Sequence, residues 1–133
     1  MRGRSFFAAA ALALGTLALS SAPAQAGYND GRCDSGELCM YYHSTQYGAS
    51  SYVDYYDEEP SHHDDVFRSS GAGKGLVVGN NASSAKCEGT RYNYAIFFNS
   101  NFNGQRHNHT CDGVRRNTPG WLQNNNASSY EPF

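Results

Sequence analysis

The pattern of apolar and polar positions divides the chain at residue 26. Residues 6–19 form one uncharged apolar stretch, preceded by Arg2 and Arg4 and followed by Ala24-Gln25-Ala26. A basic start, an apolar segment and an A-x-A site in this order are typical of a secretory signal peptide. We therefore expect residues 1–26 to direct export and to be cleaved, so that residues 27–133 are released outside the cell.

Beyond residue 26 the pattern changes to short aromatic or β-branched runs, interrupted every few residues by Gly, Asn and Ser. No window shows a sustained helical period, so the sequence favours an all-β domain. Asn103-Gly104 is a signal for a tight turn. A sandwich or Greek-key arrangement fits many short strands of this kind. We expect strands at residues 38–42, 51–56, 76–78, 92–98 and 120–122.

Two segments recur along the chain in the same order. The five residues Asn-Asn-Ala-Ser-Ser at 80–84 return letter for letter at 125–129. Before each copy stands an aromatic pair followed by small polar residues, another aromatic and Gly, at 40–48 and 96–104. Such ordered self-similarity indicates duplication within one domain. We predict motif one at about residues 31–86 and motif two at about residues 87–131.

Composition changes what kind of core to expect. Residues 27–133 contain only 3 Leu, 1 Ile, 5 Val and 5 Phe, a level typical of disorder when net charge is also high. The net charge of this part is a modest −4, and all ten Tyr remain. We therefore expect a folded, monomeric chain with an aromatic core. A weakly acidic chain without a second long apolar run is also expected to bind neither nucleic acid nor membrane.

Four cysteines supply covalent support. Cys33, Cys39, Cys87 and Cys111 are an even set in a small exported chain, which favours a disulfide framework. We favour the pairs Cys33–Cys39 and Cys87–Cys111 among the three pairings. A zinc site made by all four cysteines is the alternative, although the sequence has no C-x-x-C pair.

The repeated residues resemble the βγ-crystallin Greek-key motif, in which a folded hairpin carries two aromatics and Gly and a Ser follows later. The resemblance implies a sandwich of two Greek-key motifs. It is looser in the first half, where Ala49 stands at the expected Gly position. The matching residues are Phe97, Phe102, Gly104 and Ser129 in the second half and Tyr42, Tyr47, Gly48 and Ser84 in the first.

The signal peptide, the early C-x5-C and the run Leu-Cys-Met-Tyr-Tyr at 38–42 resemble small secreted bacterial proteins of the metalloproteinase-inhibitor type, peptidase inhibitor family thirty-six. The resemblance implies a secreted inhibitor that places a rigid loop in the cleft of an extracellular metalloproteinase. It does not identify the inhibitory loop, for which segments 111–116 and 54–65 are candidates. A calcium-stabilised structural module and a killer-toxin-like effector are the alternatives.

The βγ-crystallin calcium signature is two Asn/Asp, two variable residues, Ser/Thr and Ser. Residues 124–129 satisfy it, and residues 79–84 depart from it only at Gly79. Calcium takes about six to eight oxygen ligands, and neither segment contains a carboxylate, so we expect weak binding and no required cofactor. The alternative is that Asn and Ser only stabilise the loops. The predicted ligands are Asn80, Ser83, Asn124, Asn125 and Ser128.

Other candidate chemistry is weaker. Segment 54–65 carries six carboxylates with His62 and His63, which predicts either a solvated loop or a transition-metal site. His107-Asn108-His109 places two imidazoles on one side of a strand, as in half of a metal site. The sequence has no G-x-S-x-G, no H-E-x-x-H and no nucleophilic cysteine context, so we expect no enzyme activity.

Overall fold

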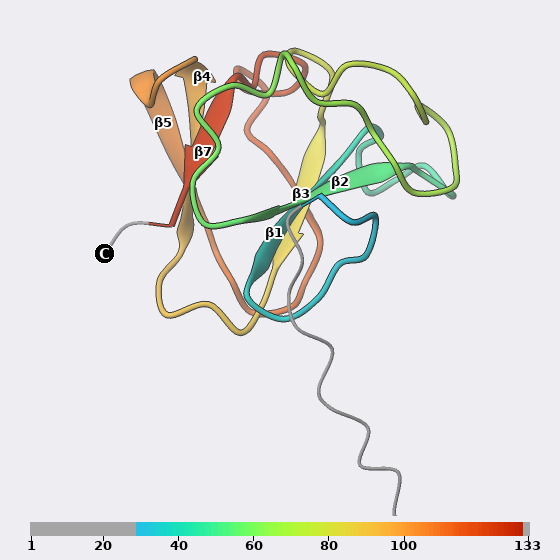
Figure 1. Ribbon diagram of the computed structural model, residues 1–133, viewed down its shortest axis with the longest axis horizontal. Helices are drawn as coiled ribbons and strands as arrows, with labels where there is room; N and C mark the ends of the chain where they lie inside the picture. The colour runs from blue at the N-terminus through green and yellow to red at the C-terminus, as the bar shows by residue number, and fades with distance from the viewer. Residues whose placement is uncertain (1–28, 132–133) are drawn as a thin grey trace, which may run out of the picture.

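The computed structural model describes residues 29–131, so the predicted signal peptide lies outside the described residues. Within them the regular structure is entirely β, with seven strands in two antiparallel sheets (Figure 1), which confirms the predicted fold class. No helix in this part of the chain is long and apolar enough to cross a membrane. The strands are β1 (Glu37–Tyr41), β2 (Tyr52–Tyr56), β3 (Ser84–Cys87), β4 (Tyr94–Asn99), β5 (Asn103–His109), β6 (Arg116–Asn117) and β7 (Ser128–Tyr130).

The two sheets repeat one plan. The first sheet has the order β2-β1-β3-β6, and the second has the order β5-β4-β7. In each, a hairpin is followed by a strand that returns beside the hairpin's first member, β3 beside β1 and β7 beside β4. Figure 1 shows β4, β5 and β7 standing together at one side of the molecule. The repeated order of sequence segments thus corresponds to a repeated order of strands.

Each motif also contributes a segment to the other motif's sheet. β6 follows β5 along the chain but pairs with β3 of the first sheet, through Ala85 and Arg116. Conversely, Glu59 follows β2 but pairs with Ser129 of β7, through backbone N–O distances of 2.7 and 2.9 Å. The two motifs are therefore interlocked, and neither can complete its sheet without the other.

Three of the expected strands coincide closely with β1, β2 and β4. The expected strands at 76–78 and 120–122 are wrong, because these residues lie in turns and loops apart from one isolated bridge at Val77. Their apolar residues Val78 and Leu122 are buried nonetheless, since they reach the core from loops. The tight turn is also displaced: it lies at residues 100–102, and Asn103-Gly104 begins β5.

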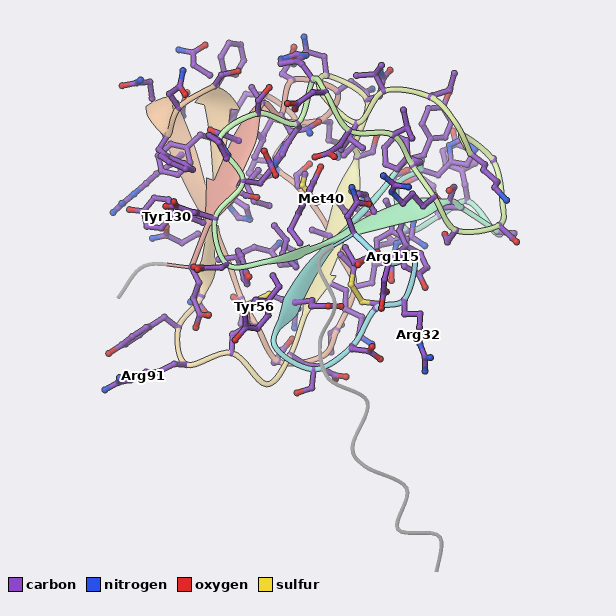
Figure 2. All side chains as sticks on the ribbon, viewed as in Figure 1. Arg32, Met40, Tyr56, Arg91, Arg115 and Tyr130 are labelled. Carbon is purple, nitrogen blue, oxygen red and sulfur yellow. A yellow bond between two sulfur atoms is a disulfide. The ribbon has the colours of Figure 1, made fainter. Side chains whose placement is uncertain are left out.

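The core lies between the sheets and follows the two-residue period of the strands. Alternate residues of β1, β2 and β4 belong to it, and loop residues complete it. Figure 2 shows Met40 in the middle of the molecule, whereas Arg32 and Arg91 point outward. The fully buried aromatics Tyr55 and Tyr94 replace the missing aliphatic volume, and the Tyr94 hydroxyl accepts a hydrogen bond from the backbone NH of Asp57 at 2.9 Å. The main core residues are Leu38, Met40, Val53, Tyr55, Phe67, Val78, Tyr94, Ile96 and Leu122.

Both favoured disulfides are confirmed, which excludes the four-cysteine zinc site. Cys33–Cys39 ties the segment before β1 to β1 itself. Cys87–Cys111 joins β3 of the first sheet to the segment that follows β5 of the second. Disulfides of this kind are consistent with an oxidising, extracellular environment.

Candidate binding site between the hairpin and the Asn/Ser loops

The repeated segments 80–84 and 124–129, here called the Asn/Ser loops, lie side by side and are related by an approximate two-fold axis. The backbone NH of Asn80 donates to the carbonyl of Asn126, and the NH of Asn124 donates to the carbonyl of Ala82, both at 2.9 Å. Asn80 and Asn124 also share a left-handed backbone, with φ of 62° and 57°. These reciprocal bonds make Asn80 equivalent to Asn124, and Ala82 equivalent to Asn126. The structural repeat is therefore one residue shorter than the identical letters indicate.

The serines that fasten each loop to its hairpin follow the same register. Ser84 Oγ donates to the carbonyl of His43, and Ser128 Oγ donates to the carbonyl of Asn99, both at 2.7 Å. Ser128, rather than Ser129, thus takes the place of Ser84 in the fold. The match of Ser129 to the Greek-key serine is corrected accordingly, because identical letters do not reveal which serine meets the hairpin.

This register changes the calcium signature. Aligned on the hairpin serine, the second copy begins at Gln123 and has Ala127 where the signature requires Ser or Thr. The Asn125 amide is already donated to two backbone carbonyls of its own loop, at 3.2 and 3.1 Å. Ser128 Oγ also accepts the backbone NH of Phe102 at 3.0 Å. Asn125 and Ser128 therefore act in holding the loop together.

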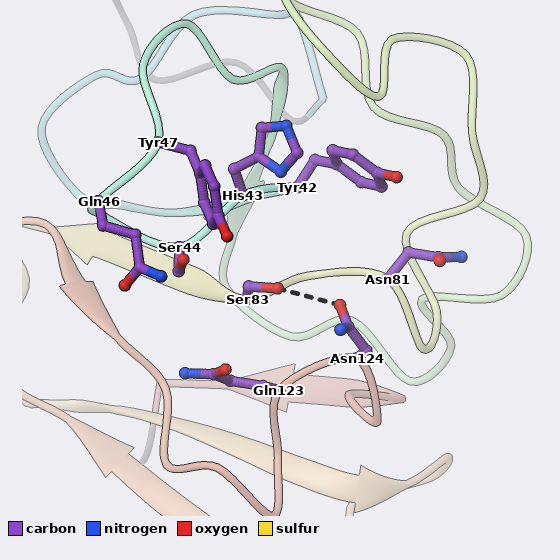
Figure 3. A pocket seen from close by; sticks show the side chains of 9 residues that line it. All are labelled: Tyr42, His43, Ser44, Gln46, Tyr47, Asn81, Ser83, Gln123 and Asn124. Atoms are coloured by element: carbon purple, nitrogen blue, oxygen red, sulfur yellow. Dashed lines mark hydrogen bonds between the residues drawn. The ribbon is translucent and has the colours of Figure 1, made fainter.

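Of the remaining predicted calcium ligands, two lie together. Ser83 Oγ donates to Asn124 Oδ1 at 3.0 Å across the junction of the loops (Figure 3). Asn80 is exposed and is not among the residues that line the pocket beside them. No carboxylate lines this pocket. Calcium binding at this point stays a prediction.

The second hairpin has the packing expected of a folded Greek-key hairpin. Phe102 packs edge-on against Phe97 and Tyr130, with ring centroids 6.1 and 5.3 Å apart. Gly104 has φ +81°, and an added Cβ would lie 2.6 Å from Asn99 Nδ2. Only glycine adopts this backbone without strain. The hairpin's aromatic residue is thereby fixed over the sheet.

The first hairpin is longer and more open. Tyr42 packs edge-on against Phe67 at 5.7 Å, but Tyr47 is 56% exposed and its ring contacts only that of His43 among the described residues. Gly48 has no positive φ, and no atom lies within 4 Å of an added Cβ. Gly48 therefore does not have the role that the resemblance implied for it.

A pocket of about 530 Å³ lies between this hairpin and the Asn/Ser loops (Figure 3). Hairpin residues 42–47 form one side, and the loops supply the other. Its volume is typical of small-molecule sites, which span about 300–1,000 Å³. The lining residues are Tyr42, His43, Ser44, Gln46, Tyr47, Asn81, Ser83, Gln123 and Asn124.

Arg115 fastens the hairpin that forms this pocket, a role that no sequence pattern indicated. Its guanidinium lies 4.1 Å above the Tyr41 ring centroid. It donates to the His43 carbonyl at 2.6 Å and to Ser84 Oγ at 2.8 Å. Since Arg115 comes from the second motif, it links the two motifs at the hairpin, although it does not line the pocket itself.

We expect Arg115→Ala to lower the free energy of unfolding by about 3 kcal/mol, because it removes charge-assisted hydrogen bonds and a cation–π contact. Urea unfolding would measure the loss. The neighbouring Arg116→Ala serves as control: Arg116 pairs with exposed Asp112, and surface ion pairs contribute little. Equal losses in the two variants would contradict the role assigned to Arg115.

Four buried residues anchor segment 54–65 in the fold, which corrects in part its interpretation as a solvated loop. Asp54 is buried in β2, and its two carboxylate oxygens accept the NH groups of Asp30 and Gly31, each at 2.8 Å. Burial raises the pKa of Asp54. Glu59 is buried where it pairs with the second sheet. The exposed residues of the segment alternate with these buried ones; they are Tyr56, Asp57, Glu58, Pro60, His63 and Asp64.

His62 is fully buried, and both its ring nitrogens are occupied. Nδ1 lies 2.9 Å from Asn126 Nδ2, and Nε2 lies 3.0 Å from Ser129 Oγ. The ring stacks on Tyr55 with centroids 4.9 Å apart. Burial lowers the pKa of His62 to about 3. A transition metal therefore cannot use His62 without opening the core.

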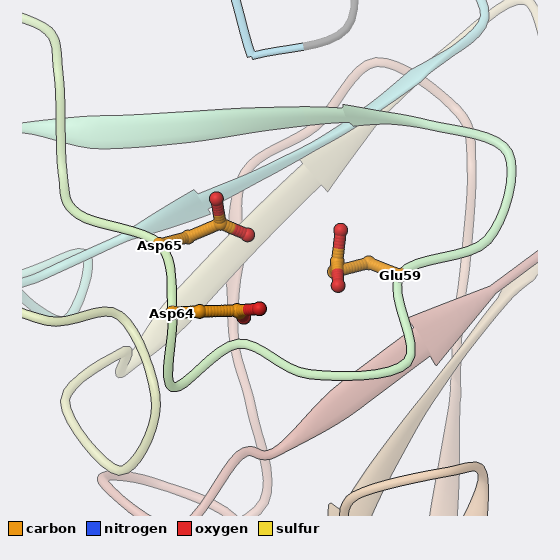
Figure 4. Close-up of side chains that lie close together, drawn as sticks. All are labelled: Glu59, Asp64 and Asp65. Atoms are coloured by element: carbon orange, nitrogen blue, oxygen red, sulfur yellow. The ribbon is translucent and has the colours of Figure 1, made fainter.

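Three acidic side chains of this segment lie together. Ligand oxygens of Glu59, Asp64 and Asp65 lie within 4.8 Å of one another (Figure 4). Asp65 Oδ1 accepts the side-chain amide of Asn29 at 2.9 Å, and burial raises the Asp65 pKa. An all-oxygen group of this kind suits hard cations better than transition metals.

His107 and His109 lie on one side of β5, with ring centroids 5.7 Å apart. His109 is buried, and its Nε2 has no hydrogen-bond partner among the described residues. Burial lowers the pKa of His109 to about 4 and also lowers that of His107. No third ligand joins this pair among the metal-ligand groups of the described residues.

Comparison with known proteins addresses the fold. No family model and no curated protein matches the chain. A solved structure described as "Evolution of the eye lens beta-gamma-crystallin domain fold" is similar over 80% of this chain and 90% of its own, with 15% identity and a TM-score of 0.52. At this identity the likeness shows the fold alone. The chain thus has a βγ-crystallin-like fold, as its repeated hairpin residues predict.

Proposed function

We propose that the protein is a secreted inhibitor of an extracellular metalloproteinase and that segment 111–116 is its inhibitory loop. The main observation in support is an exposed apolar residue in a loop whose two ends are both fixed. Val114 is 50% exposed, Cys111 is held by its disulfide, and Arg116 pairs within the first sheet. The exposed Asp112 carboxylate also connects the two ends of the loop by accepting two hydrogen bonds from the Arg116 guanidinium, at 2.5 and 2.7 Å.

A loop constrained in this way suits protease inhibition for a physical reason. Binding costs less conformational entropy when the loop already has its bound shape, and a fixed backbone slows productive cleavage. The other candidate, segment 54–65, contributes Asp54, Glu59 and His62 to the interior of the fold. Its exposed residues are separated by these buried ones, whereas segment 111–116 presents Val114 between two fixed ends, so we favour segment 111–116.

Titration against a thermolysin-like enzyme tests the proposal. We expect proteolysis to stop at a near-stoichiometric ratio. Val114→Asp should weaken inhibition at least about tenfold, because a central interface residue contributes more than ~1.4 kcal/mol. Leu76→Asp is the matched control, since Leu76 is 47% exposed outside this loop.

Two results would contradict the proposal. The first is full activity of several metalloproteinases with excess protein. The second is inhibition that Val114→Asp and Leu76→Asp reduce equally. Melting temperatures of both variants should stay near the parent value, since each substitution affects an exposed side chain.

A further inference from the structure

The pocket of about 530 Å³ between the first hairpin and the Asn/Ser loops has a lining without Asp, Glu, Lys or Arg. Carboxamides, aromatic rings, hydroxyls and the His43 imidazole form its walls (Figure 3). We propose that this pocket binds a neutral saccharide, with Tyr47 as the stacking surface. No residue of segment 111–116 lines the pocket, although Arg115 fastens its hairpin, and the inference does not depend on the proposed protease inhibition.

Tyr47 is the first line of support. Its ring is 56% exposed, whereas Phe102 of the second hairpin is packed against Phe97 and Tyr130. The first hairpin connection spans residues 42–51 and the second only residues 100–102, so the longer connection holds Tyr47 away from the sheet. The face of an aromatic ring carries partial negative charge. It therefore attracts the polarised C–H groups on one face of a pyranose ring.

The carboxamides are the second line of support. Gln46 makes no hydrogen bond with the described residues. Gln123 donates its Nε2 to the Thr118 carbonyl at 3.0 Å, which leaves its Oε1 as an acceptor. Asn124 uses Oδ1 to accept from Ser83, which leaves its Nδ2 as a donor. Sugar hydroxyls both donate and accept, and carboxamides offer both functions without charge.

Charge and rigidity narrow the ligand class. Apart from the His43 imidazole, the lining has no side chain that could oppose the charge of a phosphate, carboxylate or ammonium group. Arg115 lies behind the hairpin, but its guanidinium is occupied by Tyr41 and by the His43 carbonyl. These contacts also fix the backbone of the pocket wall, which lowers the entropy cost of binding. Peptide sites instead use exposed sheet edges or apolar grooves, whereas this pocket is polar.

Calorimetric titration of the mature protein with maltotriose, chitotriose and mannotriose tests the inference for soluble saccharides. Co-sedimentation with insoluble glucan, chitin and mannan tests polysaccharides. The two assays together distinguish a soluble oligosaccharide ligand from an insoluble polymer. We expect binding in at least one arm. Tyr47→Ala and Gln46→Ala should each weaken it at least about tenfold, the loss of one well-made contact.

Tyr56→Ala is the matched control, because Tyr56 is 53% exposed and does not line the pocket. It should leave saccharide binding unchanged, and so should Val114→Asp. Unaltered melting temperatures would show that Tyr47→Ala and Gln46→Ala still fold. Absence of binding to all six probes at millimolar sugar would overturn the inference, as would binding that Tyr47→Ala and Gln46→Ala leave intact.

Discussion

Replacing Cys87 and Cys111 with alanine is expected to lower the free energy of unfolding by about 3.5 kcal/mol in the chain-entropy treatment. The bridge closes a separation of 24 residues and joins the two sheets. Its loss enlarges the unfolded ensemble while the interlocked sheets lose their covalent link. Urea unfolding at neutral pH would measure the change.

The other disulfide provides a control of the same chemistry. Cys33–Cys39 closes a separation of only 6 residues, so its removal should cost about 2.3 kcal/mol by the same relation. Both double substitutions remove the same atoms, and so the difference reflects loop length and position. A larger loss for Cys33→Ala/Cys39→Ala would mean that the link between sheets is not the principal covalent support.

His62→Gln is expected to flatten the dependence of stability on pH. The folded state holds His62 neutral down to a pKa of about 3, whereas the unfolded chain takes up a proton near the ordinary value of 6.5. Between these values the unfolded state binds more protons. The free energy of unfolding therefore falls with decreasing pH, by about 1.4 kcal/mol per pH unit from this residue.

Other buried groups also make the free energy of unfolding depend on pH, some increasing and some decreasing it. The pH profile of the parent must therefore be compared with that of a variant. His109, with a pKa lowered to about 4, adds to the loss at acid pH. Burial raises the pKa of Glu37 to about 6. Its stabilising contribution is present below the unfolded value of 4.5 and is lost as pH rises through about 6. Subtracting the His62→Gln profile from that of the parent isolates His62.

Ser129→Ala separates titration from packing. It removes the hydroxyl at 3.0 Å from His62 Nε2 but retains the imidazole. We expect a lower stability at every pH with most of the parent slope. Urea unfolding at several pH values from 4 to 7 would give the free energy of unfolding of the three proteins. Parallel profiles for the parent and His62→Gln would contradict the assignment of a buried neutral imidazole.

Local sequence patterns were sufficient to predict the strands whose own residues form an apolar or aromatic run. β1, β2 and β4 are short apolar and aromatic runs that are mostly buried, and neighbouring positions in the chain are enough to show such a run. The favoured cysteine pairs are also confirmed. The repeated aromatics and glycines further pointed to a βγ-crystallin-like fold, because a folded hairpin needs those residue types close together in the chain.

Contacts between distant segments settled the rest. β6 and the strand position of Glu59 are polar and short, and each pairs because the other motif presents a free sheet edge. β7 is also short, and it pairs with β4 of its own motif, from which it is separated along the chain by β5 and β6. Burial of His62 depends on Asn126 and Ser129, more than sixty residues away. The spacing of 44 residues between equivalent positions of the two loops depends on which serine binds a hairpin carbonyl, Ser84 in one and Ser128 in the other. Identical residues in two repeats do not show these pairings, since hydrogen-bond partners depend on which distant segments the fold brings into contact.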